Sequence, residues 1–291
     1  MRGIIVSVIA LALAGLSAAA SQRYSVTGLV LKVDRPHRSM VVSCEDIPGY
    51  MPAMVMSFAV RESKELDDLE PGKRVDFTLI VDENSARAED VRTRDFESTE
   101  QESQAARRLK LVENLATPDV PPSYLSAGQS VPNFTLTDQN RRQVSLSQFA
   151  GAVVAINFIY TRCPLPNFCF RLSNYFGLLQ KRFRSRLGQD LFLLTITFDP
   201  EHDQPEVLAA YSNTWNADLR GWRFLTGTGD EVRSVCRMFG VTYWPDESLF
   251  THSLQTVIID RQGKLAANLE GNQFTAQQLG DLIETVMDGS K

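Results

Sequence analysis

The stretch Ala152-Val-Val-Ala-Ile-Asn-Phe-Ile-Tyr160 runs directly into Thr161-Arg-Cys-Pro-Leu-Pro-Asn-Phe-Cys169. A continuous apolar run of this length predicts a strand that is buried on both faces, as in a sheet covered by helices. Strand-like and helix-like patterns alternate around it from residue 128 to residue 288. We therefore predict an α/β domain with helices on both faces of its sheet.

The expected elements of this half follow one another at short intervals. The expected strands are 134–138, 143–146, 153–160, 191–198, 222–225 and 254–260. The expected helices are 169–187, 205–215, 229–239 and 275–288. A strand that ends in a cysteine-bearing loop, which in turn opens a helix, indicates a thioredoxin-like sheet.

Three residues of this half are candidates for chemistry. Cys163 and Cys169 follow the buried strand, and His252 stands just before a second apolar run. Two thiols and one imidazole suit a soft metal ion or disulfide chemistry. Cys236 differs from them, because it lies on the apolar face of the expected helix 229–239 and is predicted to be an inert core residue.

The N-terminal half has a different pattern. Residues 24–95 contain short strand-like runs separated by turn signals, at 26–33, 39–44, 54–60, 73–81 and 86–92. Such runs predict a small antiparallel barrel of the OB type. Residues 96–127 then read as a charged helix, 97–115, which is stopped by a proline-rich stretch, and we expect an interdomain connector there.

The chain begins with an apolar segment, residues 1–20, that carries one arginine and ends in small residues before Ser21. This pattern fits a cleaved signal peptide. The alternative is an uncleaved anchor, residues 4–20, which approaches the ~18 residues needed to span a membrane. Both predict an exported protein, periplasmic or in the cell envelope. The net charge of −5 argues against a nucleic-acid partner.

The C-terminal half resembles the Sco (SenC) family in three motifs, which are Phe158-Ile-Tyr-Thr-Arg-Cys-Pro164, Thr197-Phe-Asp-Pro-Glu-His-Asp-Gln-Pro205 and Thr251-His-Ser253. That family consists of thioredoxin-fold copper chaperones that serve cytochrome c oxidase assembly. The resemblance implies that Cys163, Cys169 and His252 bind copper, as Cu(I) or Cu(II), for a copper-accepting oxidase subunit or another exported copper protein. The chain departs from the family pattern, because five residues, including Pro164 and Pro166, separate cysteines that the family spaces by three.

The N-terminal half resembles the CusF-like periplasmic copper-binding fold over Cys44-Glu-Asp-Ile-Pro-Gly-Tyr-Met-Pro-Ala-Met-Val-Met-Ser-Phe58. In that family a histidine and two methionines bind a monovalent metal, and some members add a tryptophan cap. The resemblance implies that Met54 and Met56 are ligands, with Cys44 near the place of the histidine and Met51 at the place of the tryptophan. Residues two apart on a strand share a face, and thioether sulfur favours Cu(I).

Several alternatives stay open. Cys163 and Cys169 could form a plain disulfide, with His252 on the surface, or the Cys2His set could hold zinc. The chain could instead be a thiol-disulfide oxidoreductase that acts on an oxidase subunit or another exported protein. The five-residue spacing and the absence of proline from residues 246–256 weaken that interpretation, and the residues before Cys163 do not fit a thiol peroxidase. The methionines could simply pack a small core.

Other polar and aromatic residues receive no metal-binding role. His37 is expected to be solvated and His202 is not assigned as a ligand. Asp199 and Asp203 are expected to cap the following helix, with shaping of a loop near the metal as the alternative. The three tryptophans are expected to be core or rim residues, namely Trp215, Trp222 and Trp244.

The sequence thus predicts an exported metallochaperone with two copper-binding domains. We add the hypothesis that Cu(I) enters at Met54 and Met56 and passes to the Cys163–Cys169 loop without release, because one chain carries both sites. The connector 96–127 would act as a semi-rigid spacer between them.

Overall fold

The computed structural model describes residues 21–82, 85–94, 124–246 and 249–289. The expected signal peptide or anchor, 1–20, lies outside the described residues, as does the expected connector up to residue 123 with its helix 97–115. Within the described ranges, no helix is long and apolar enough to cross a membrane.

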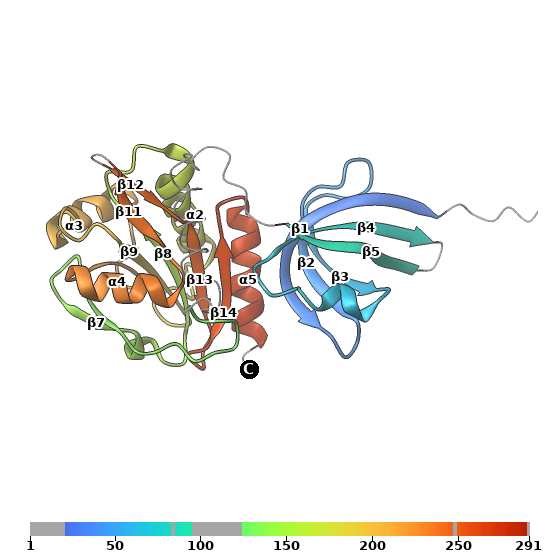
Figure 1. Ribbon diagram of the computed structural model, residues 1–291, viewed down its shortest axis with the longest axis horizontal. Coiled ribbons are helices and arrows are strands. Elements are labelled where there is room, and N and C mark those ends of the chain that lie inside the picture. Colours follow the sequence, from blue (N-terminus) through green and yellow to red (C-terminus); the bar gives the residue numbers. More distant parts are fainter. Residues whose placement is uncertain (1–20, 83–84, 95–123, 247–248, 290–291) are drawn as a thin grey trace, which may run out of the picture.

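The N-terminal half is a small barrel of five strands (Figure 1). Its elements are β1 (Gln22–Asp34), β2 (Ser39–Cys44), β3 (Met54–Val60), the 3₁₀ turn η1 (Ser63–Leu66), β4 (Arg74–Asp82) and β5 (Ser85–Arg94). The barrel closes in the order β1-β2-β3-β5-β4. The prediction of a wholly antiparallel barrel is wrong at one seam, because β3 and β5 run parallel where Ala59 and Val60 pair with β5.

The C-terminal half is a seven-stranded mixed sheet in the order β14-β13-β8-β9-β10-β6-β7. Its strands are β6 (Thr135–Asp138), β7 (Gln143–Ser145), β8 (Val153–Ile159), β9 (Leu191–Thr197), β10 (Trp222–Thr226), β13 (Gln255–Ile259) and β14 (Leu265–Glu270). The central strands β8, β9 and β10 are parallel. All seven residues of β8 are buried, and burying each large apolar side chain contributes roughly 1.5–3 kcal/mol.

Helices cover both faces of this sheet, as the sequence predicts. They are α2 (Arg171–Arg182), α3 (Pro205–Thr214), α4 (Gly229–Met238) and α5 (Ala276–Gly289), with short turns η2 (Leu146–Phe149) and η3 (Pro166–Phe170). Apolar residues of α2 and α5 form one core with the sheet, and those of α4 form the other. Cys236 is fully buried in that second core, which confirms its predicted place.

Two details differ from the expected elements. The helix expected at 169–187 is shorter, because η3 precedes it and α2 ends at Arg182. A second difference is a two-stranded hairpin that the sequence reasoning missed, β11 (Tyr243–Asp246) and β12 (Leu249–His252). This hairpin matters because it carries His252.

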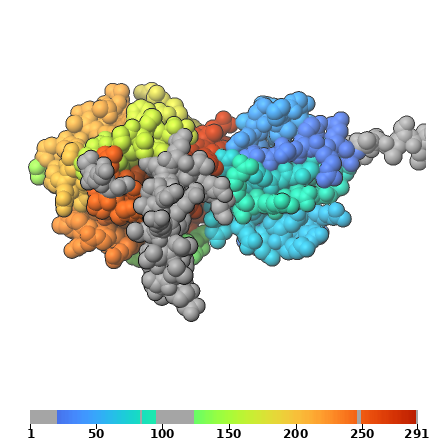
Figure 2. Space-filling model, turned by 45° about the horizontal axis from the view of Figure 1, so that its top comes forward, coloured from blue at the N-terminus to red at the C-terminus, as the bar shows by residue number. Residues whose placement is uncertain are grey.

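The barrel packs directly against α5 (Figures 1 and 2), and its Gly72 also contacts β14. Strand β1 is buried on both faces: Val26 and Val30 face the barrel core, whereas Leu29 and Leu31 join the core of the other half. Gly72 approaches β14 so closely that an added Cβ would lie 3.1 Å from Leu269 Cγ. The two halves therefore share a packed apolar interface in addition to their covalent link.

Candidate metal centres

The cysteine loop begins where β8 ends. Two prolines, Pro164 and Pro166, lack backbone N–H groups, so the loop cannot continue directly as a regular helix. Its backbone is non-helical at Phe168, with φ −111° and ψ −108°. This bend precedes Cys169, which is 1% exposed, whereas Cys163 is only partly buried.

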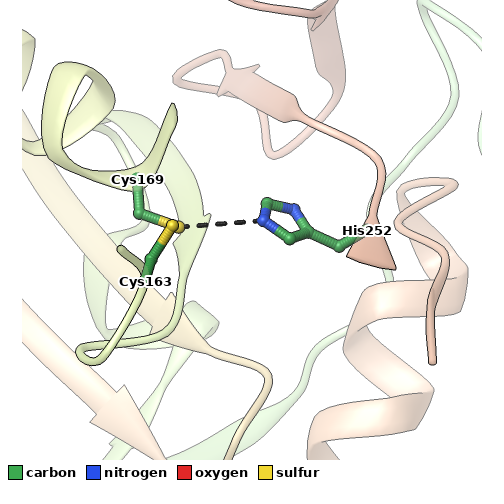
Figure 3. A group of neighbouring side chains, drawn as sticks. All are labelled: Cys163, Cys169 and His252. Carbon is green, nitrogen blue, oxygen red and sulfur yellow. Dashed lines mark hydrogen bonds between the residues drawn. The ribbon is translucent and has the colours of Figure 1, made fainter. Parts of the chain in front are cut away.

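His252 enters the same site from β12 and is 8% exposed. Its ring packs between Phe198, at 4.7 Å, and Tyr160, at 5.7 Å between ring centroids. Its Nδ1 lies 2.9 Å from the Ser253 carbonyl, to which it can donate. That bond places the proton on Nδ1, so the free lone pair is on Nε2, which lies 3.9 Å from Sγ of Cys169 (Figure 3).

The structure therefore brings the three predicted residues of the C-terminal half together. The ligand atoms of Cys163, Cys169 and His252 all lie within 4.8 Å of one another. Sulfur donors favour Cu(I), and imidazole accommodates either copper oxidation state. A free Nε2 and two adjacent sulfurs fit a copper ion, so the donor set matches the ion that the resemblance implies.

The two thiols differ in acidity because their surroundings differ. The pKa of Cys163 falls from 9.0 to about 4, chiefly through a hydrogen bond with Cys169, although partial burial opposes this. Burial raises the pKa of Cys169 well above 9.0. At neutral pH Cys163 is thus the thiolate and Cys169 keeps its proton. Both cysteines are free thiols in the structure.

Asp203 forms hydrogen bonds with a residue that lies just before Cys163 of the cysteine loop. It is fully buried and accepts hydrogen bonds from the Thr161 N–H, the Thr161 hydroxyl and the Thr197 hydroxyl. The residue that caps α3 is Gln204, whose side chain makes no capping bond. The expected capping role of Asp203 is therefore wrong, because its bonds instead join the ends of β8 and β9.

Asp199, His202 and Asp203 form a second cluster whose ligand atoms also lie within 4.8 Å of one another. The carboxylate of Asp199 binds the guanidinium of Arg162 at 2.8 Å. The Nδ1 of His202 lies 3.0 Å from Asp203. Each of the three side chains thus has a partner within the protein.

The candidate barrel site lies at one end of the β2–β3 pair. Cys44 pairs directly across from Met54, and the next inward position along β3 is Met56. Cys44 is 2% exposed, and burial raises its pKa to about 12. Met56 is partly buried against the barrel core, as is Met51, whereas Met54 is 44% exposed.

At the end of β3 that carries Met54 and Met56, one edge of the strand has no partner strand among the described residues. Strand β5 pairs with β3 only at Ala59 and Val60. Beside Met54 and Met56, β3 has β2 as its one neighbouring strand in the part of the chain that the structure describes. The side chain of Met54 is 44% exposed, so an ion could reach its sulfur from solvent.

The remaining singled-out residues lie as expected. The side chain of His37 is 80% exposed and contacts Asp34, so its solvated position is confirmed. Trp222 is fully buried, while Trp215 and Trp244 are partly buried.

Comparison with known proteins agrees with this geometry. Residues 123–288 match the family model SCO1/SenC. The chain belongs to the SCO1/SenC family. Residues 23–92 of this SCO1/SenC protein also match the model of the copper binding periplasmic protein CusF. Both matches coincide with the two halves of the fold.

Individual relatives match about half of the chain. Protein sco1 of Schizosaccharomyces pombe is 27% identical over 160 residues, covering 52% of this chain and 58% of that protein. The SCO1 protein homolog of Bacillus subtilis is 30% identical over 161 residues, covering 54% of this chain and 81% of that protein. A crystal structure from Aquifex aeolicus VF5 superimposes with a TM-score of 0.50 at 18% identity, covering 55% of this chain and 94% of that chain, and shows the fold alone.

Proposed function

We propose that this SCO1/SenC protein is an exported copper chaperone with one copper site in each half. The observation that carries the proposal is the convergence of Cys163, Cys169 and His252 from two separate elements. Copper is the cargo. The proposed division of the chain is a signal peptide at 1–20, a copper-binding barrel at 24–95, a connector at 96–127 and the Sco domain at 128–288.

In the Sco domain, each proposed ligand has a distinct role. Cys163 supplies a ready thiolate, because its pKa is about 4. Cys169 must lose a proton when copper binds, since burial keeps it protonated in the free chain. His252 supplies Nε2, which the bond from Nδ1 to Ser253 keeps free.

In the barrel, Met54 and Met56 are the proposed Cu(I) ligands, with Cys44 as a third sulfur beside them. Their neighbouring positions on β2 and β3 and the exposure of Met54 support this role. Thioether sulfur is a poor donor to hard ions, so the site should prefer Cu(I) to Zn(II).

The proposed recipient is the copper site of a respiratory oxidase subunit. The family resemblance supports this recipient, and the periplasmic description of CusF supports an exported location. The apolar segment at 1–20 supports export as well.

One observation favours a second function, thiol-disulfide exchange. A thiolate at Cys163 beside a protonated Cys169 is the arrangement of a nucleophile and a resolving thiol. Cys163 would attack a partner's disulfide and release one partner thiolate. Cys169 would then lose its proton and attack Cys163, which releases the second thiolate and leaves a Cys163–Cys169 disulfide. The pair is oxidised and the partner disulfide is reduced.

Copper titration of the reduced full chain under anaerobic conditions tests the main proposal. Cu(II) should give thiolate-to-copper charge-transfer bands, which Cys163→Ser or Cys169→Ser should abolish. Cys236→Ser is the matched control, because that thiol is fully buried in a separate core and should leave the bands unchanged. Intact bands in Cys169→Ser would contradict the three-ligand site. Rapid reduction of a disulfide peptide without copper binding would favour the second function.

A further inference from the structure

The loop between β14 and α5, residues 271–275, lies between the barrel and the cysteine loop. On one side, the Asn272 side-chain amide donates to the carbonyl of Asn167, inside the cysteine loop. On the other side, the Arg74 guanidinium of β4 donates to the carbonyl of Gln273. Two adjacent residues of one loop thus contact the barrel and the cysteine loop.

The contact with Asn167 involves more than one hydrogen bond. Arg171 lies 3.2 Å from the side-chain oxygen of Asn167 and 3.5 Å from the carbonyl of Asn272, and donates to both. Asn272 is 7% exposed. Pro164 and Pro166 supply no backbone donors to the cysteine loop, so bonds from outside the loop such as these contribute to its shape.

The side chain of Arg74 forms bonds in both halves of the protein. Its side chain is 17% exposed, and it also binds Glu45 at 3.1 Å. Glu45 directly follows Cys44, a proposed ligand of the barrel site. The two terminal nitrogens of Arg74 serve these two acceptors, Gln273 and Glu45, as its planar fork allows, whereas the buried Nε has no hydrogen-bond partner among the described residues.

Polar contacts at α5 fix the barrel in this position. The Ser43 hydroxyl donates to Asp281 at 2.7 Å, and both residues are buried. The Gln278 amide donates to the Ser43 carbonyl at 3.2 Å. Arg182 of α2 holds the second oxygen of Asp281 at 2.7 Å. A barrel anchored in this way can hold Arg74 against the 271–275 loop.

We propose that Arg74 and Asn272 are positioning residues through which the docked barrel holds the Cys163–Cys169 loop in shape. The barrel then acts on the Sco-type site as a structural brace, besides any copper of its own. The inference rests on the proposed function only in giving the loop a metal-binding role. Its test is made on the metal-free chain, so its failure is distinguishable from failure to bind copper.

Amide hydrogen exchange of the reduced, metal-free full chain tests the brace. The readout is exchange in peptides that cover residues 161–172, with peptides from α4 as an internal control. Asn272→Ala should speed exchange of the loop about tenfold, as expected for loss of one well-made hydrogen bond from local stability. Arg74→Met should do the same, although it changes no residue of the Sco domain.

Two further variants separate bracing from general damage. Arg74→Lys keeps the charge but cannot serve both acceptors, so it should give an intermediate increase of about threefold. Arg87→Met is the matched control, because Arg87 pairs only with Asp82 and Glu89 inside the barrel. It should leave the loop at wild-type exchange.

Wild-type loop exchange in both Arg74 variants would overturn the proposal. So would an equal increase in α4, because that result indicates destabilisation of the whole fold. A selective increase in the loop with Arg74→Met and Arg74→Lys, and none with Arg87→Met, would support it.

Discussion

Asp203 accepts two hydrogen bonds from one residue, Thr161, through its backbone N–H at 3.0 Å and its hydroxyl at 2.5 Å. The same carboxylate accepts from the Thr197 hydroxyl at 2.6 Å. One buried side chain therefore holds the residues at the ends of both β8 and β9. Thr161, one of these residues, lies two positions before Cys163. A rigid entry to the cysteine loop follows from this arrangement.

Asp203→Asn should destabilise the chain by about 2–3 kcal/mol, because an amide nitrogen cannot accept hydrogen bonds that the carboxylate oxygen accepts. Urea unfolding measures this loss. Asp230→Asn is the control: the side chain of Asp230 is 93% exposed, and its change should cost under about 0.5 kcal/mol. Equal midpoints for the two variants would show that the buried carboxylate does not hold the loop.

Cys163 should react with iodoacetamide at a nearly constant rate between pH 6 and pH 9, since its pKa of about 4 keeps it ionised there. Cys169→Ala removes the largest cause of the shift, so the rate should then rise with pH toward an ordinary thiol pKa of ~8.5. A wild-type rate that climbs steeply through pH 8 would contradict the thiolate assignment.

The same shift predicts how stability depends on pH. Between pH 4 and pH 9 the folded chain has lost a Cys163 proton that the unfolded chain retains, so stability rises with pH across this window. The contribution is fully present above pH 9 and is lost as pH falls through 4. Urea midpoints of the reduced wild type should show this slope, and those of Cys163→Ala should lack it.

Met54→Leu and Met56→Leu should weaken Cu(I) binding to the barrel while costing less than about 1.5 kcal/mol each in stability, because they conserve volume. The measurement is competition with a Cu(I) chelator, in a full chain whose Cys163 and Cys169 are serine. Met40→Leu is the control, because Met40 is a buried methionine of the barrel core. Lower stability with unchanged Cu(I) affinity would show that Met54 and Met56 only pack the core.

If Cu(I) passes between the halves of one chain, its transfer rate should not depend on protein concentration. Covalent attachment raises the effective concentration of one site near the other to roughly millimolar. The full chain is loaded at the barrel with one equivalent of Cu(I), and arrival at Cys163 and Cys169 is followed after serial dilution. A rate that falls in proportion to concentration would mean transfer between separate molecules.

Much of the fold is predictable from the sequence, because burial leaves a periodic pattern along the chain. The run at 153–160 predicts a central strand, and β8 is that strand, buried along its whole length. The barrel strands are likewise found close to their expected positions. The β11–β12 hairpin is not predicted, because apolar and polar residues alternate only weakly in its two strands. The parallel pairing of β3 with β5 leaves no pattern in the local sequence.

The candidate site is predictable in part. Cys163, Cys169 and His252 were identified by residue type and motif, and the structure brings them together. The role of Asp203 differs from the prediction, because a carboxylate before a helix usually caps it, whereas here it binds Thr161, 42 residues upstream.

The sequence by itself determined the two classes of domain and the residues that offer soft donors, since hydrophobic periodicity and side-chain chemistry are local properties. Only the tertiary structure decided which cysteine carries the charge, because that depends on the hydrogen bond between Cys163 and Cys169 and on the burial of Cys169. Tertiary structure also decided that the barrel docks on α5. The bond between Ser43 and Asp281 joins residues 238 positions apart, and no local pattern encodes such a contact.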